Sequence, residues 1–205
     1  MAVLNEEQEM LRDMAREWVV NESPVTEFRK VRASGEPEAF NRDAYATMAQ
    51  MGWAGVIIPE EHGGSDFGFL SAGLVVEELG KTLTASPLVM NTVAASAIVL
   101  GGSDEQKARW LPRLASGEAI ATLAVDEGPS HDPAKIETSV SDGKLSGTKA
   151  FVHEAHGADL FVVAAKDGLY LVEKGDGVAL TTRKLTDQRS HADVTFDGAA
   201  AEKLA

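Results

Sequence analysis

The sequence lacks cysteine: none of its 205 residues is one. Without cysteine there is no disulfide framework, no thiolate metal site and no cysteine nucleophile. Cations are scarce as well, because 19 Lys and Arg stand against 32 Asp and Glu and give a net charge of −13. Nucleic acids and anionic membranes bind proteins through clustered cations. We therefore expect neither as a partner, and an anionic ligand needs a local site.

A long hydrophobic run is also missing. The longest stretch of low charge, Leu83–Ser103, contains Pro87 and a glycine pair. Its helical part is shorter than the roughly 20 apolar residues that span a bilayer. The first ten residues carry acids where a secretion signal carries bases. Together with the absence of cysteine, this predicts a cytoplasmic protein without membrane insertion.

The first half of the chain has helical periodicity. Apolar spacing and capping signals predict helices near residues 4–18, 41–51, 68–81, 87–101 and 103–110. Asn41 is the expected N-cap of one helix, and Ser103 with Gln106 forms the capping box of another. Trp18, Trp53 and Trp110 are expected in the core.

Other segments of this half predict interruptions. Residues 23–40 mix Ser, Pro, Gly and charge, which indicates a loop. Pro112 is expected to break the last helix, with a second short turn ending at Gly117. Residues 87–101 are apolar on every side, so this helix is expected to be buried all round.

The second half changes to the period of β-strands. Asp142-Gly143 and Asp167-Gly168 each separate two alternating or apolar segments, which is the strongest short-range signal for a β-hairpin. The fold class is therefore α+β. An all-α domain over residues 1–117 is followed by an antiparallel, sheet- or barrel-like β domain over residues 118–205.

The glycine-rich stretch IIPEEHGG, residues 57–64, is the first candidate for chemistry. It matches neither a P-loop nor a dinucleotide-binding loop, and its acids repel phosphate. Pro59 and the glycines favour a sharp corner of the chain, and a ligand site is the less favoured alternative. SHD at 130–132 and HEAH at 153–156 lack the spacing of a triad or zinc motif. No catalytic residue and no metal site is predicted.

Two motifs at this spacing resemble the acyl-CoA dehydrogenase family. MGWAGVIIPEEHGG at 51–64 matches its Pro-Glu-Glu-x-Gly-Gly corner, and QKARWLPRLASGE at 106–118 matches its Gln-Lys-x-x-x-Leu-Pro segment. The resemblance covers essentially the whole chain. It implies oxidation of an acyl-CoA thioester at the α and β carbons by FAD, with an electron-transfer flavoprotein or similar acceptor and a homo- or hetero-oligomer.

The family also has a C-terminal helical bundle, which carries the catalytic carboxylate. We expect both to be absent from these 205 residues, so Glu60 and Glu61 are not assigned as the base. The resemblance places the acyl pocket between the helices near 68–81 and 87–101 and the β domain. Small residues at Ala94, Ala95 and Ala97 leave room there, and helix packing explains them equally well.

The resemblance implies a flavin site in the β domain. AVDEGPSHD at 124–132 corresponds to the family's Leu-Thr-Glu-Pro-x-x-Gly-Ser-Asp segment, so the backbone of Val125 and Asp126 faces the flavin edge. KAFVHEA at 149–155 corresponds to its Lys-x-Trp-Ile-Thr segment. Phe151, Val152 and His153 are the cofactor-binding residues implied there, with Phe151 on the ring and His153 near N5.

Three of these positions depart from the family pattern. Asp126 replaces a Thr beside flavin O2, His131 replaces a Ser at the pyrophosphate, and His153 replaces a Thr or Ser. An ionised Asp126 facing O2 disfavours reduction, because reduced flavin is anionic. The sequence is similar to a divergent bacterial branch that includes steroid and aromatic acyl-CoA dehydrogenases. Two hypotheses follow: a flavin-dependent dehydrogenase, or a non-catalytic subunit that binds little or no FAD.

Overall fold

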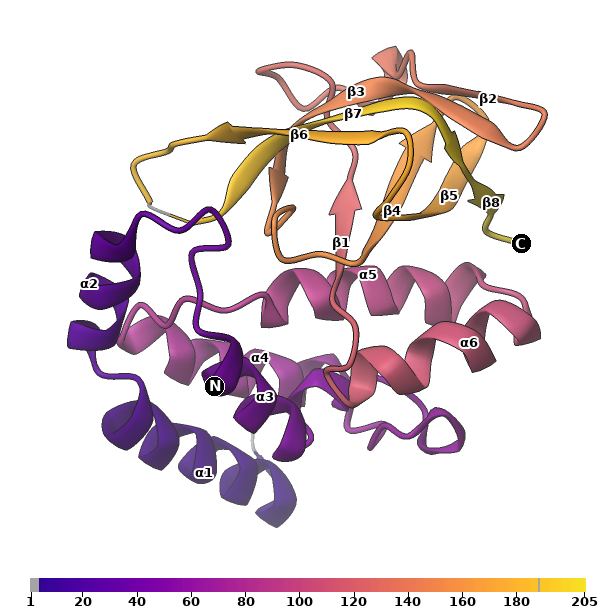
Figure 1. The fold of residues 1–205 in the computed structure, drawn as a ribbon. Helices are drawn as coiled ribbons and strands as arrows, with labels where there is room; N and C mark the ends of the chain where they lie inside the picture. Colours follow the sequence, from indigo (N-terminus) through magenta and orange to yellow (C-terminus); the bar gives the residue numbers. More distant parts are fainter. Residues whose placement is uncertain (1–3, 188) are drawn as a thin grey trace.

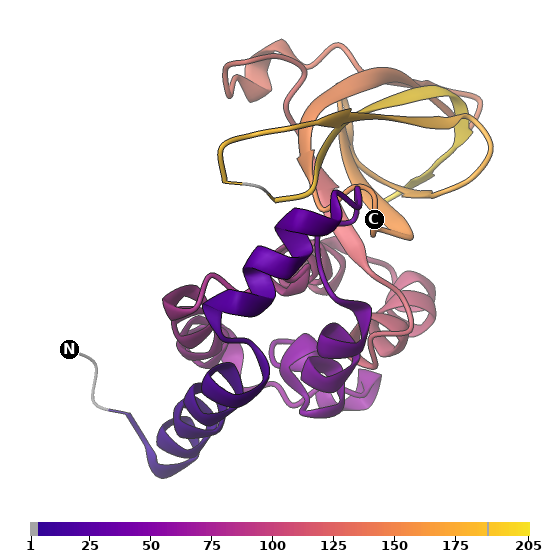
Figure 2. The same ribbon diagram turned by 60° about the vertical axis from the view of Figure 1, so that its left-hand side comes forward.

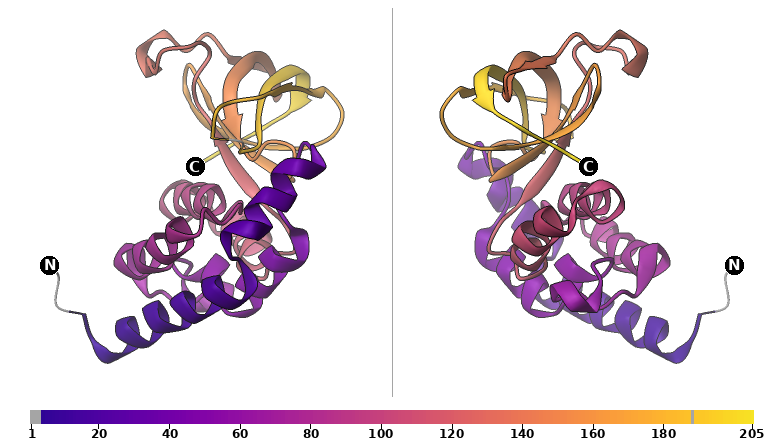
Figure 3. Two further views of the ribbon diagram at one scale, coloured as in Figure 1. Left: turned by 90° about the vertical axis from the view of Figure 1, so that its left-hand side faces the viewer. Right: turned by 90° about the vertical axis from the view of Figure 1, so that its right-hand side faces the viewer.

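The computed structural model describes residues 4–187 and 189–205. The chain forms two layers, with helices below and a strongly curved β layer above (Figure 1). Helix α1 runs along the base, far from the strands (Figure 3). Helix α2 rises from the helical layer to the β layer (Figure 2). Within the described ranges, no helix has the length and apolarity needed to cross a membrane.

The helical layer contains six α-helices and two 3₁₀ turns. The α-helices are α1 Glu6–Glu22, α2 Val25–Ser34, α3 Arg42–Gln50, α4 Gly68–Lys81, α5 Leu88–Gly101 and α6 Asp104–Ala115, and the turns are Trp53–Gly55 and Glu60–His62. The side chain of Asn41 accepts hydrogen bonds from the first turn of α3, as predicted. Ser103 and Gln106 form the predicted capping box of α6.

Three helix predictions were wrong. The predicted loop at 23–40 contains α2, a helix without a buried residue, in which the helical spacing of Val25, Phe28 and Val31 is outnumbered by polar residues. α6 continues through Pro112 to Ala115, because the buried Trp110 and Leu114 hold it in place on both sides of the proline. α5 is buried on one side only, and Leu100 is 82% exposed.

The β layer contains two four-stranded sheets, with strand orders β1-β4-β5-β8 and β2-β3-β7-β6. The strands are β1 Ala121–Ala124, β2 Ser139–Ser141, β3 Lys144–His153, β4 Leu160–Ala165, β5 Gly168–Glu173, β6 Val178–Arg183, β7 His191–Ala200 and β8 Glu202–Lys203. Both predicted hairpins are present, as β2–β3 and β4–β5. The domain is not purely antiparallel, because β1 pairs with β4 in parallel.

The core continues from one layer into the other. All six residues of β4 are buried. Leu160 and Val162 pack with the helices, whereas Phe161 and Val163 pack inside the β layer. The three tryptophans are buried in the helical core, as predicted. The predicted domain boundary after residue 117 falls in the connection between α6 and β1, and it stays a prediction.

The stretch at residues 57–64 is a corner of the chain. Glu60–His62 forms a single 3₁₀ turn that begins after Pro59, and Gly63 follows with φ +81°. Position 64 requires glycine for a different reason, since a Cβ there would lie 2.0 Å from the carbonyl oxygen of Ile58. Over the described part of the chain, no three His, Asp or Glu residues gather in a way that would hold a metal ion.

Candidate cofactor site and adjoining clefts

The segment after β1 lies side by side with β3. The ammonium group of Lys149 donates to the carbonyl of Val125 at 2.9 Å. The backbone N–H of Ala150 donates to the carbonyl of Asp126 at 2.7 Å. Both carbonyls are therefore occupied by β3. Within residues 4–187 and 189–205, the backbone N–H groups of Asp126 and Glu127 make no hydrogen bond, so this segment presents two free donors.

Phe151 stands at a bulge in β3. The pairing with β7 shifts register between Lys149 and Val152, and Phe151 has φ +53°, an uncommon conformation for a bulky residue. The bulge leaves the Phe151 ring half-buried, with the guanidinium of Arg183 5.7 Å from its centroid. The Val152 side chain points into the core of the β layer and is 2% exposed. Of the two predicted cofactor contacts, Phe151 and Val152, only Phe151 has a side chain that a planar cofactor can reach.

His153 ends β3 beside a second histidine. Its ring centroid lies 4.3 Å from that of His191, and its carbonyl accepts a hydrogen bond from Thr122 at 2.6 Å. Burial lowers the pKa of His153, and the neighbouring His191 and Arg189 lower it further. The Nδ1 atom is buried without a hydrogen-bond partner among the described residues. This nitrogen is therefore enclosed by the protein, and any contact of His153 with a ligand must come from the part of its half-buried ring that stays accessible.

Asp126 and His131, two of the departures from the family pattern, contact each other. Nδ1 of His131 lies 2.7 Å from a carboxylate oxygen of Asp126. The side chains are 36% and 69% exposed, so water screens the pair. The Asp126 carboxylate therefore has a hydrogen-bond partner within its own chain.

The structure brings the predicted residues together at one place. Val125, Asp126, Phe151 and His153 come from adjacent segments, and His131 joins them through Asp126. Sequence reasoning missed Lys149, which is 0% exposed. The signal was present, since Lys149 lies four residues after the buried Leu145 and therefore on the same, inward face of β3.

An apolar cleft of about 450 Å³ opens below the β layer. It lies between α2, the α4–α5 connection and the connection from β6 to β7. Its apolar lining comes from Phe28, Val76, Leu79, Leu83, Ala85, Leu88 and Val89. This is the region between the two helices and the β domain where the resemblance places an acyl chain. Ala94 and Ala95 are fully buried and do not line the cleft, so packing within the helical layer explains them.

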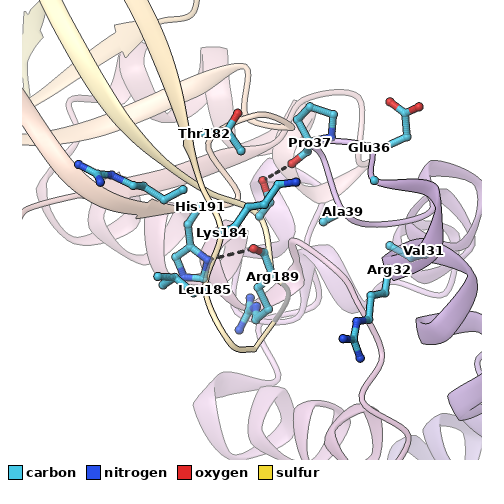
Figure 4. A pocket seen from close by; sticks show the side chains of 13 residues that line it. Val31, Arg32, Glu36, Pro37, Ala39, Thr182, Lys184, Leu185, Arg189 and His191 are labelled. Carbon is cyan, nitrogen blue, oxygen red and sulfur yellow. Dashed lines mark hydrogen bonds between the residues drawn. The ribbon is translucent and has the colours of Figure 1, made fainter.

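A second recess of about 280 Å³ adjoins the cleft and shares Arg32 and Arg189 with it. Figure 4 shows Arg32, Lys184 and Arg189 around this recess. The hydroxyl of Ser190 donates to the carbonyl of Pro37, in the α2–α3 connection, at 2.8 Å. Arg189 also donates to Glu154 at 2.7 Å. Burial raises the pKa of Glu154 to about 7, although Arg189 opposes the shift. Arg189 thus connects the wall of both clefts to the buried end of β3.

Comparison with known proteins gives the family. The family model described as "Acyl-CoA dehydrogenase, N-terminal domain" matches residues 5–118. The acryloyl-CoA reductase (NADH) of Anaerotignum propionicum is 32% identical over 191 residues, which cover 84% of this chain and 47% of that protein. The mitochondrial isovaleryl-CoA dehydrogenase of Bos taurus is 30% identical over 171 residues, 80% of this chain and 40% of that protein. The chain spans about half the length of the curated relatives it matches.

Solved structures agree with this assignment. A Tcur3481-Tcur3483 steroid ACAD variant superposes with a TM-score of 0.89 at 28% identity, covering 98% of this chain and 57% of its own. The ChsE4-ChsE5 complex from Mycobacterium tuberculosis gives 0.86 at 26% identity, covering 99% and 57%. The fold, a helical domain that leads into a curved β domain, is the one these proteins share. The chain belongs to the acyl-CoA dehydrogenase family.

Proposed function

We propose that this chain forms the helical and β parts of an FAD-dependent acyl-CoA dehydrogenase. The observation that carries the proposal is that the free Asp126 and Glu127 N–H groups lie on the segment bonded to β3 immediately before the half-buried Phe151 ring. Donors beside an aromatic face suit a flavin, which has a carbonyl edge and a planar ring. The apolar cleft nearby suits the hydrocarbon part of an acyl substrate.

The residues have distinct roles in this proposal. FAD, when bound, supplies a hydride acceptor for the β carbon of the acyl-CoA. The Asp126 and Glu127 N–H groups bind its carbonyl edge, Phe151 packs against its ring, and His153 donates or accepts a hydrogen bond near the reacting face. Val152 contributes only backbone, and His131 fixes the position of the Asp126 carboxylate through their hydrogen bond.

A base for the α proton is not assigned from this chain. Each described carboxylate around the proposed site already has a partner: Asp126 with His131, Glu127 with Lys149, Glu154 with Arg189 and Asp193 with Arg183. We therefore propose that the base comes from a segment or subunit outside the described residues. A homo- or hetero-oligomer in the cytoplasm, with an electron-transfer flavoprotein or similar acceptor, completes the proposal.

The test is the visible spectrum of the purified protein, as this chain and within any longer natural polypeptide that contains it. We expect a yellow protein that bleaches under anaerobic conditions when acyl-CoA is added. Fatty acyl and steroid acyl thioesters are compared, because one structural relative is a steroid ACAD. A colourless protein that takes up no added FAD would overturn the proposal.

A second candidate is a non-catalytic subunit of a heteromeric dehydrogenase. The observation that favours it is the Asp126–His131 pair, which stands where the family has a neutral Thr and Ser. One relative is solved as a complex of two named proteins, ChsE4 and ChsE5. Co-expression with each dehydrogenase-like protein of the same organism, followed by a flavin count per complex, separates the candidates. The non-catalytic subunit is supported if the complex holds one FAD per two unlike chains and if Phe151→Ala in this chain does not lower that number.

A further inference from the structure

Lys149 is a charged side chain enclosed by the β layer. It is 0% exposed, in a chain whose other cations mostly lie at the surface. Its ammonium group has two described partners, the carbonyl of Val125 at 2.9 Å and the carboxylate of Glu127 at 2.7 Å. Both partners belong to the segment that carries the two free N–H groups. The lysine therefore joins β3 directly to residues 125–127, the segment proposed to face the flavin.

Glu127 extends this connection across the loop that follows. Its carboxylate accepts the N–H of Glu137 at 2.7 Å, and the N–H and hydroxyl of Thr138 at 2.9 and 2.5 Å. Gly147 makes the approach of Thr138 feasible, because a Cβ at Gly147 would lie 2.4 Å from the Thr138 hydroxyl. Burial opposes ionisation of Glu127, but the hydrogen bonds from Lys149 and residues 137–138 lower its pKa to about 2. One ionised carboxylate thus closes the loop and holds the lysine.

Stability alone does not account for such a pair. Replacing a buried ion pair by well-packed apolar residues is often neutral or stabilising, because the charges must be removed from water. An apolar pair in place of Lys149 and Glu127 would leave the Val125 carbonyl without this hydrogen-bond donor. With the carbonyls of Val125 and Asp126 both held by β3, the planar peptide units fix the direction of the Asp126 and Glu127 N–H groups.

We infer that Lys149 is a positioning residue for the cofactor: by holding the Val125 carbonyl, it directs the N–H group of Asp126 at the flavin edge. The N–H of Glu127 beside it is directed by the bond from Ala150 to the Asp126 carbonyl. The inference rests on the proposed function, since it needs a bound flavin. It assigns a role to a residue that touches neither the cofactor nor the substrate. It also predicts which backbone donors the cofactor uses.

The decisive variant is Lys149→Met combined with Glu127→Gln, which removes both charges and keeps an acceptor for residues 137–138. We expect it to fold and to bind FAD about tenfold more weakly than the unmodified protein, the equivalent of one hydrogen bond. The visible band of its bound flavin should also lose fine structure. The control is Val194→Ala, which lies opposite Lys149 in β7 and is fully buried but outside the hydrogen-bond network. It should lower the unfolding temperature without changing the flavin spectrum.

A measurement on the unmodified protein covers the case in which the double variant fails to fold. Hydrogen exchange should show the Asp126 and Glu127 amides unprotected without FAD and protected with it. Unchanged exchange on binding would overturn the inference, and so would a folded double variant with normal FAD affinity and spectrum. If the unmodified protein binds no FAD in any natural form, the proposed function fails instead, so the two failures are distinguishable.

Discussion

Gly64→Ala tests whether packing of the backbone defines the corner at residues 57–64. A Cβ at Gly64 would lie 2.0 Å from the carbonyl oxygen of Ile58 and 2.6 Å from that of Gly55. Both oxygens belong to the backbone, so no rotation of a side chain relieves the clash. The chain must move, although Ser65 and Asp66 donate to these same oxygens at 3.1 and 3.0 Å.

The cost follows from these contacts. Two weakened backbone hydrogen bonds cost about 1 kcal/mol each, and displacement of a packed backbone adds about 1–3 kcal/mol. We expect a loss of about 3–5 kcal/mol in the free energy of unfolding. In a chain of this size each kcal/mol lowers the unfolding temperature by about 2–4 °C, so the drop is about 10 °C. Gly63→Ala meets no atom within 4 Å and bears only the strain of φ +81°, about 1–2 kcal/mol.

Urea unfolding followed by tryptophan fluorescence is a suitable assay, because all three tryptophans are buried in the helical core. Gly73→Ala is the matched control, since Gly73 is exposed on α4 with open space around it. It should be neutral or stabilise the protein by up to about 1 kcal/mol. A Gly64→Ala protein as stable as Gly73→Ala would refute the packing argument and favour the ligand-loop alternative for this motif.

Three further predictions concern the site and its surroundings. Asp126→Thr restores the family residue and should tighten FAD binding or raise the flavin midpoint potential; no change in either would show that Asp126 does not face the flavin. Burial raises the pKa of Glu154 from about 4.5 to about 7, so the fold favours the protonated form and its contribution to stability is lost as pH rises between these values. The loss is roughly 3 kcal/mol, and Glu154→Gln should remove this pH dependence when urea unfolding is compared at pH 5 and pH 8. Val89→Trp should fill part of the apolar cleft and weaken binding of long-chain acyl-CoA about tenfold more than that of short-chain acyl-CoA; equal effects on both would place the acyl chain elsewhere.

Local signals in the sequence were enough to predict much of the fold. The capping box at Ser103 and the Asp142-Gly143 turn involve residues only a few positions apart, so their meaning does not depend on the rest of the chain. Pairing of β1 with β4 could not be predicted in this way. Some 35 residues separate these strands, and a parallel pair has no turn that fixes its register. Likewise, continuation of α6 through Pro112 depends on long-range packing of Trp110 and Leu114.

The candidate site shows a different limit of the sequence. When each position is considered alone, Asp126 and His131 are two separate replacements of family residues, and each argues against FAD binding. In the structure they form one hydrogen-bonded pair, so the two departures are coupled in space. Lys149 and Glu127 show the same principle inside the β layer, where Lys149 alone would be a buried charge without a counter-ion. A substitution at one member of such a pair therefore changes the environment of the other, and the two positions have to be tested together.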